Sequence, residues 1–291
     1  MGSLIRISAP CKVNLHLRVL GVRDDGFHGI ESVFQLISLA DELSVSIDGE
    51  RGSCLVSSPR MELPRENTLT RAVDQFRLET GITDGLRVEI EKRVPAGAGL
   101  GGGSSDAASL LRALNRLFNT GLTLDALSRM AAAVGSDVPF FLSAPAAVVE
   151  GRGERIAPIA ARRDLSGVLV WPEVHCPTRE AYSLVDDWIA AGRDSGRVWT
   201  QVSELGGVYA GPVSGWSAFG NSFTAPVEAK FPVIRRAREA IEAQAAVFSA
   251  MTGSGSSVFG IFDDDDAANA ACSRLSTQWV YCVKFLLLAS L

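Results

Sequence analysis

The sequence has no excess of positive charge. Its 28 lysines and arginines are outnumbered by 33 aspartates and glutamates, which gives a formal net charge of −5 over 291 residues. A protein that coats a nucleic acid duplex carries a basic surface, so this composition argues against that class of partner. Phosphate binding stays open, because a few local groups can hold an anion whatever the net charge. We therefore expect no nucleic acid partner.

Long apolar runs and paired cysteines are missing as well. No stretch approaches the roughly 18 to 20 apolar residues that a membrane-spanning helix needs. Residues 1–6 contain no basic segment followed by an apolar run, so we expect no secretory signal. The five cysteines form no Cys-x-x-Cys pair, which disfavours a disulfide framework and a zinc site. These absences predict a cytoplasmic chain with buried free thiols and no membrane partner.

What the chain does have is the length and the apolar content of two packed lobes. With 291 residues, of which 47% are hydrophobic, it is long enough for about two domains of ~150 residues each. Glycine, arginine and proline interrupt the helix and strand patterns at residues 151–164. We predict two lobes that each mix helices and strands, one formed by residues 1–160 and the other by residues 161–291.

Hydrophobic periodicity predicts the individual elements. Strict alternation over residues 13–19 predicts a half-buried strand, whose polar face carries Lys12, Asn14, His16 and Arg18. Further strands are predicted at residues 43–47, 86–90, 168–171, 257–262 and 279–285. Apolar residues at helical spacing predict helices at residues 67–79, 107–118, 124–134, 178–189, 233–246 and 266–276. Residues 190–220 show less regular patterning.

The sharpest feature is a glycine cluster directly before a predicted helix. Residues 95–106 read Pro-Ala-Gly-Ala-Gly-Leu-Gly-Gly-Gly-Ser-Ser-Asp. The glycines remove side chains where a ligand must approach backbone N–H groups, and a helix start adds unpaired N–H donors and partial positive charge. This combination predicts a di- or triphosphate site, with the hydroxyls of Ser104 and Ser105 available to phosphate or magnesium. Asp106 would repel phosphate, so we interpret it as a helix cap facing away from the ligand.

Two common nucleotide-binding patterns fit this glycine cluster less well. The pattern GxxxxGK[ST] needs a lysine that is missing, and GxGxxG fails because its sixth position is Ser104. Asp125 lies near the distance expected of a ribose-binding acid, but it falls at a predicted helix start, so a nicotinamide enzyme is disfavoured. A flexible connector before a capped helix is a weaker alternative, since each glycine loses entropy on folding.

Together with other segments, the cluster resembles the GHMP kinases, named for their galacto-, homoserine, mevalonate and phosphomevalonate members. Residues 9–17 read Ala-Pro-Cys-Lys-Val-Asn-Leu-His-Leu, and residues 135–141 read Gly-Ser-Asp-Val-Pro-Phe-Phe. The remaining matches are at residues 24–35, 95–105, 221–227 and 251–260. Three positions depart from the usual pattern, since Cys11 stands where alanine is commoner, Phe27 where tyrosine is commoner, and Ser222 where an acid is usual.

The resemblance implies a kinase that uses ATP and magnesium to phosphorylate an alcohol. It implies an α+β fold, with an N-terminal lobe like ribosomal protein S5 domain 2 and a ferredoxin-like C-terminal lobe. The segments around His28 and Asp137 are similar to those of members whose small-molecule alcohol carries a cytidine diphosphate. A homoserine or mevalonate type of kinase, and a non-catalytic nucleotide-binding module, remain alternatives. A monomer or weak homodimer is expected.

The resemblance also implies roles for individual residues. Lys12 and Asp137 would be the catalytic pair, although a strand lysine and a helix N-cap are the plain alternatives. His28 would read the cytosine edge, between aromatic rings stacked on the base. Residues implied to bind ATP are Asn67, Lys92, Pro95, Gly97, Gly99, Leu100, Gly101, Gly102, Gly103, Ser104 and Ser105, with Ser105 also a magnesium candidate. Residues implied to bind the acceptor are Asn14, Phe27, His28, Tyr182, Gly253, Ser254 and Gly255.

Overall fold

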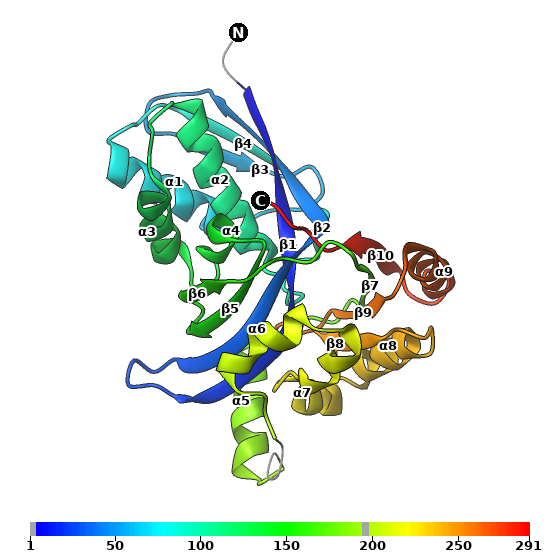
Figure 1. The fold of residues 1–291 in the computed structure, drawn as a ribbon. Helices are drawn as coiled ribbons and strands as arrows, with labels where there is room; N and C mark the ends of the chain where they lie inside the picture. Colours follow the sequence, from blue (N-terminus) through cyan, green and yellow to red (C-terminus); the bar gives the residue numbers. More distant parts are fainter. Residues whose placement is uncertain (1–3, 194–197) are drawn as a thin grey trace.

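The computed structural model describes residues 4–193 and 198–291 and contains two sheets (Figure 1). Residues 1–3, in the segment expected to lack a secretory signal, and residues 194–197, in the less regular stretch, lie outside it. The first sheet contains β1 (Leu4–Val22), β2 (His28–Ile47), β3 (Cys54–Ser57), β4 (Leu86–Glu91), β5 (Ala146–Gly151) and β6 (Arg155–Pro158). The second contains β7 (Ser166–Trp171), β8 (Phe248–Met251), β9 (Val258–Phe262) and β10 (Tyr281–Leu286).

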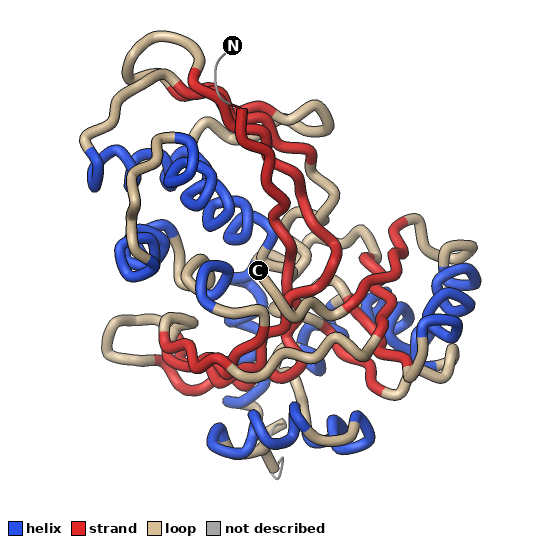
Figure 2. Tube along the Cα trace, turned by 45° about the horizontal axis from the view of Figure 1, so that its top comes forward, coloured by secondary structure: helices blue, strands red, loops and turns tan. Residues whose placement is uncertain are grey.

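A long antiparallel hairpin of β1 and β2 is the central element of the molecule. In Figure 2 its two strands run through the middle of the molecule. The first sheet has the order β3–β4–β2–β5–β6, with β1 also paired to β2, and the second sheet is antiparallel in the order β10–β7–β9–β8. Isolated bridges join Leu17 to Asn221 and Ile37 to Leu287, so the hairpin contacts both halves of the chain. The division after residue 160 stays a prediction.

The helices fall into two groups. The first group lies beside the first sheet (Figure 1) and contains α1 (Thr68–Thr80), α2 (Gly102–Leu117), α3 (Leu124–Val134) and the short α4 (Phe140–Ser143). The second group contains α5 (Thr178–Ala190), α6 (Val202–Ala210), the 3-10 helix η1 (Val213–Ala218), α7 (Thr224–Lys230), α8 (Pro232–Glu242) and α9 (Asp265–Leu275). Local signals set several ends: the Asn67 side chain accepts the N–H groups of Leu69 and Thr70, and the Thr123 side chain caps α3.

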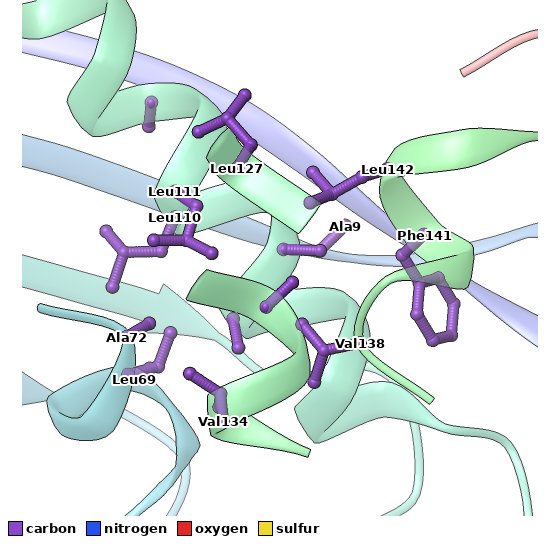
Figure 3. Close-up of a cluster of buried hydrophobic side chains, with 14 of the residues drawn as sticks. Ala9, Leu69, Ala72, Leu110, Leu111, Leu127, Val134, Val138, Phe141 and Leu142 are labelled. Atoms are coloured by element: carbon purple, nitrogen blue, oxygen red, sulfur yellow. The ribbon is translucent and has the colours of Figure 1, made fainter. Parts of the chain in front are cut away.

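Three clusters of buried apolar side chains hold these layers together. The first lies between the first sheet and α1–α4, where Figure 3 shows Leu110, Leu111 and Leu127 side by side. The second joins the hairpin to the second sheet and contains Trp216 and Phe259. The third packs α5, α7, α8 and α9 against the other face of the second sheet. The two sheets are therefore parts of one continuously packed molecule.

The structure confirms the α+β expectation but corrects three details. Lys12, Asn14 and His16 are at most 3% exposed, so the strand predicted to be half-buried is buried on both faces. The reason is that the 221 and 252 segments cover the polar face. Within the less regular stretch, α6 and η1 are helical. All five cysteines are free thiols, but only Cys11 and Cys176 are buried.

Among the helices of the described residues, none combines the length and the apolar character needed to cross a bilayer.

The first core should dominate the stability of the fold. Leu110 is fully buried on α2, whereas Leu78 on α1 is 80% exposed. We expect Leu110→Ala to lower the free energy of unfolding by about 2–5 kcal/mol, because it leaves a cavity in a close-packed core. The matched Leu78→Ala should change it by less than ~0.5 kcal/mol. Urea denaturation followed by circular dichroism measures both, and equal effects would contradict this assignment of the core.

Candidate functional site

A cavity of about 520 Å³ lies where the hairpin, the start of α2 and the second lobe meet. Most of the predicted site residues line it: Lys12, Asn14, Asn67, Lys92, Pro95, Gly97, Gly99, Leu100, Gly101, Gly102, Gly103, Ser104, Asp137, Tyr182, Gly253 and Ser254. The lining does not include Phe27, His28, Ser105 or Gly255. Segments that are far apart in the sequence thus converge on one space, of a size typical of small-molecule sites.

The glycine cluster forms the loop that leads into α2. The helix begins at Gly102, and its N-cap Gly101 has φ +68°, a left-handed conformation that favours glycine. The first N–H groups of a helix have no partner within it. In α2 the Ser104 N–H already donates to the Gly101 oxygen at 3.0 Å, which leaves the N–H groups of residues 101–103, all of which line the cavity. This end of the cavity therefore presents backbone donors and the positive end of a helix dipole, which suits an anion.

Gly99 is required by the protein itself. An added Cβ at Gly99 would lie 2.1 Å from the backbone oxygen of Thr252, and one at Gly253 would lie 2.7 Å from the oxygen of Gly99. The two glycine-rich loops, residues 95–103 and 252–257, thus touch backbone to backbone. The sequence predicts that the glycines clear space for a ligand, but at this position they clear space for the second loop.

Lys12 lies at the centre of the cavity wall, on β1. Its Nζ donates to Asn14 Oδ1 at 2.5 Å and to the backbone oxygen of Gly99 at 3.1 Å, and it stands 4.8 Å from the centre of the Phe34 ring. Burial lowers the pKa of Lys12, while the negative charge of Asp137 acts in the opposite direction. Lys12 is therefore an oriented, nearly solvent-free group with Asp137 as its charged neighbour.

Asp137 lies in the turn between α3 and α4 and lines the same cavity. The N-cap of α4 is Pro139, so Asp137 is not a helix cap, which is the plain alternative to the catalytic role that the resemblance implies. An added Cβ at Gly153 would lie 3.0 Å from Asp137 Oδ1, which places the carboxylate against the β5–β6 turn. Within the described residues no direct ion pair joins Asp137 to Lys12. Both groups face one cavity, with room for a ligand group between them.

A buried cluster of charges lies beside the glycine-rich loop of the cavity. Lys92 Nζ is 2.5 Å from Asp41 Oδ2 and 2.8 Å from Asp106 Oδ2. Asp41 Oδ1 also accepts the backbone N–H groups of Arg93 and Val94, at 2.5 and 2.8 Å. The two carboxylates thus leave Lys92 with no net positive charge to offer a ligand. Asp41 also holds the strand end that leads into the loop.

The interpretation of Asp106 as a helix cap is wrong. Because α2 already begins at Gly102, Asp106 lies within the helix, where it is 3% exposed and lines the cavity. Its Oδ1 is buried and has no hydrogen-bond partner among the described residues. Burial raises the pKa of Asp106 to about 7, although Lys92 opposes that shift.

Of the expected base-binding residues Phe27, His28 and Tyr182, only Tyr182 lines the cavity. The His28 ring, at the start of β2, stacks on Tyr182 of α5 with ring centres 4.6 Å apart, and His28 Nε2 is 2.8 Å from Asp186 Oδ1. Burial and the charge of Asp137 raise the pKa of Tyr182 to about 12, so this ring lies near the candidate catalytic carboxylate. Phe27 is 55% exposed, outside the cavity lining.

The other predicted residues take mixed positions. Ser105 is fully buried, and its hydroxyl donates to the Pro10 backbone oxygen at 2.7 Å, away from the cavity lining. Asn67 lines the cavity while its side chain caps α1. Gly255 lies outside the lining, in the loop whose Thr252 hydroxyl donates to the Gly99 oxygen. Among the described residues, no group of three or more His, Cys, Asp or Glu side chains forms a metal cluster.

Sequence reasoning missed two residues of the site. Asp41 lies within β2, where it is fully buried and pairs with Lys92, but its sequence neighbours do not distinguish it from an exposed strand acid. Arg152 lines the cavity but falls in the segment interpreted as a boundary between the lobes. The one sequence signal for Arg152 is the tripeptide Gly-Arg-Gly at residues 151–153, in which glycines flank a single cation.

Comparison with known proteins gives a consistent result. The family described as "GHMP kinases N terminal domain" matches residues 67–144, and the one described as "GHMP kinases C terminal" matches residues 208–280. The chain is 45% identical over 284 residues to the 4-diphosphocytidyl-2-C-methyl-D-erythritol kinase of Treponema pallidum subsp. pallidum, and the match covers 96% of this chain and 97% of that protein.

Two solved structures are also similar. The crystal structure of a 4-(cytidine 5'-diphospho)-2C-methyl-D-erythritol kinase has a TM-score of 0.80 at 33% identity, covering 97% of this chain and 99% of that one. Homoserine kinase from Cytophaga hutchinsonii has a TM-score of 0.73 at 16% identity, covering 99% and 95%. The second likeness shows the fold alone.

The raised pKa of Asp106 predicts a pH dependence of stability. In the unfolded chain the carboxyl has its ordinary pKa of about 4, whereas in the folded protein it is about 7. Between these values the folded state keeps a proton that the unfolded state has released. The stabilising contribution of the protonated group is therefore full below about pH 4 and is lost as the pH rises to about 7.

Urea denaturation at stepped pH tests this expectation. Relative to Asp106→Asn, the wild type should lose unfolding free energy between about pH 4 and pH 7 and change little above that range. Asp74→Asn, which removes an exposed carboxylate on α1, is the control and should run parallel to the wild type. Parallel curves for the wild type and Asp106→Asn would show that Asp106 is ionised throughout.

Proposed function

Since the chain belongs to the GHMP kinase family, we propose that it is an ATP-dependent kinase that phosphorylates the 2-hydroxyl of 4-diphosphocytidyl-2-C-methyl-D-erythritol. Such a reaction belongs to the non-mevalonate route to isoprenoid precursors. The observation that carries the proposal is the 45% identity, over nearly the whole chain, to a kinase with this substrate in its name. Solved homoserine and mevalonate kinases are 16% identical or less at similar coverage.

The donor would bind at the glycine-loop end of the cavity. Backbone N–H groups of residues 101–103, at the positive end of α2, would hold its phosphates, because the Ser104 N–H already donates to the Gly101 oxygen. Because Lys92 is paired with Asp41 and Asp106, it would add no net positive charge to the donor site. Its role there would be to help position the donor. Pro95, Gly97 and the other lining residues of the loop would shape the space around the nucleotide.

Magnesium is part of the proposal. When bound with ATP, it neutralises phosphate charge and is held mainly by phosphates with one or two protein oxygens. The buried Oδ1 of Asp106, which lacks a described partner, and the hydroxyl of Ser104, which lines the cavity, are hard oxygen donors that fit this ion. The Ser105 hydroxyl, the candidate that the resemblance implies, would first have to break its hydrogen bond to Pro10.

Asp137 and Lys12 would act on the acceptor alcohol. Asp137 would accept a hydrogen bond from the hydroxyl, orient it toward the donor and take its proton as transfer proceeds. The buried Lys12 ammonium, fixed by Asn14 and Gly99, would stabilise the negative charge that develops between the two substrates. The groups are held apart around a cavity, which leaves the alcohol a place between them.

The cytidine part of the acceptor would bind near His28, Phe27 and Tyr182. In the structure His28 stacks on Tyr182 and bonds Asp186, so binding of a base between the rings would require these side chains to separate. Gly253 and Ser254 line the cavity from the second loop. We place the protein in the cytoplasm as a monomer or weak homodimer whose partner is this small molecule.

An acceptor panel tests the reaction directly. ADP release should follow addition of 4-diphosphocytidyl-2-C-methyl-D-erythritol with ATP and magnesium, while mevalonate and homoserine should release less than about one hundredth as much, because neither fills the base-binding end. Turnover of one of those acids instead would assign the chain to another branch of its family. Binding of ATP without turnover of any acceptor would favour the nucleotide-binding module.

Asp137→Asn tests the catalytic role. The amide keeps the shape of the side chain but cannot take a proton, so we expect kcat to fall by roughly 10²–10⁴-fold while the Kd for ATP stays within about twofold. Asp125→Asn, at an exposed position in the first turn of α3, should keep full activity. Steady-state kinetics and calorimetry measure both quantities, and a parallel loss of ATP binding would assign Asp137 a structural role.

A further inference from the structure

Among the described residues that line the cavity, Arg152 is the one cation that the proposed mechanism does not use. The described lining contains three cationic side chains, those of Lys12, Lys92 and Arg152. Lys92 is neutralised by two carboxylates, and Lys12 is buried beside the reacting groups. Arg152 Nε lies 4.0 Å from Asp25 Oδ2, with both side chains 39% exposed. An ion pair that long between solvated groups leaves an arginine available to another anion.

The position of Arg152 links the two ends of the acceptor site. Its guanidinium lies 4.8 Å from the centre of the Phe27 ring, at the base-binding end. The next residue, Gly153, lies against the Asp137 carboxylate, at the alcohol end. The turn itself is held by hydrogen bonds: the Arg152 N–H donates to Glu154 Oε2 at 2.5 Å, and the Gly153 N–H donates to the Glu150 backbone oxygen at 3.1 Å.

We propose that Arg152 binds the diphosphate of the acceptor and so selects acceptors that carry one. The inference rests on the proposed function. In an acceptor whose diphosphate joins cytidine to the alcohol, that diphosphate lies between the base and the reacting hydroxyl, which is where Arg152 stands. A guanidinium donates paired hydrogen bonds to phosphate oxygens and stays charged at every physiological pH. The Arg152 guanidinium also lies over the Phe27 ring, and this cation–π contact helps to orient it.

Binding of CDP and of cytidine separates this role from a structural one. Both ligands contain the base, but only CDP carries the diphosphate. Calorimetry with a non-hydrolysable ATP analogue in excess keeps both ligands out of the donor site. We expect Arg152→Gln to raise the Kd for CDP about tenfold or more, the effect of losing one hydrogen bond from a charged donor, and to leave the Kd for cytidine unchanged. Arg152→Lys, which keeps the charge but not the paired geometry, should fall between.

Arg155→Gln is the matched control. Arg155 lies on β6, its side chain is 65% exposed and pairs with Glu150, and it is outside the cavity lining. This variant should bind both ligands as the wild type does.

The other outcomes overturn the inference in distinguishable ways. If Arg152→Gln binds CDP like the wild type, Arg152 does not contact the diphosphate. If it loses CDP and cytidine equally, Arg152 only supports the Phe27 ring. If the wild type itself binds neither ligand, the cytidine-carrying acceptor is wrong, and the proposed function fails together with this inference.

Discussion

The backbone contact between two glycine-rich loops is the constraint on which the rest of the site depends. Gly99 and Thr252 are 153 positions apart in sequence, yet a single Cβ at Gly99 would collide with the Thr252 oxygen. The Gly99 carbonyl accepts hydrogen bonds from Lys12 Nζ and from the Thr252 hydroxyl. The Ser257 N–H donates to the oxygen of Ala98. One loop conformation thus orients the lysine, the start of α2 and the second lobe together.

The same contact explains how the molecule tolerates so many buried polar groups around its cavity. Lys12, Asn14 and Thr252 are almost fully buried, and each has a hydrogen-bond partner from another segment. A buried charge without partners would destabilise the fold by several kcal/mol. These hydrogen bonds therefore form only when the two lobes pack in one relative position. The same burial removes water from the place where phosphoryl transfer would occur.

Local patterns predict much of this structure, and the errors share a physical origin. The N-termini of α1 and α3 are set by the capping residues Asn67 and Thr123. Such a cap involves only residues close together in the sequence, so a local pattern can reveal it. The burial of the β1 polar face depends on residues more than 200 positions away, which alternation cannot reveal. Asp106 is misplaced by sequence reasoning because α2 begins with two glycines, residues of poor helix propensity that tertiary contacts nevertheless hold in the helix.

The distribution of charge around the cavity would give the two proposed substrates different sites, although both are polyanions. At the glycine-loop end the formal charge of Lys92 is cancelled by Asp41 and Asp106, so donors that carry only partial charges face the ligand there. At the acceptor end Arg152 keeps a full charge within a turn shaped by two glycines. Rigid backbone donors suit a phosphate chain that every ATP presents identically. A single side-chain cation suits an acceptor whose phosphates must be told apart from those of the donor. In the proposed arrangement Lys12 and Asp137, which line the same cavity, would act between the two.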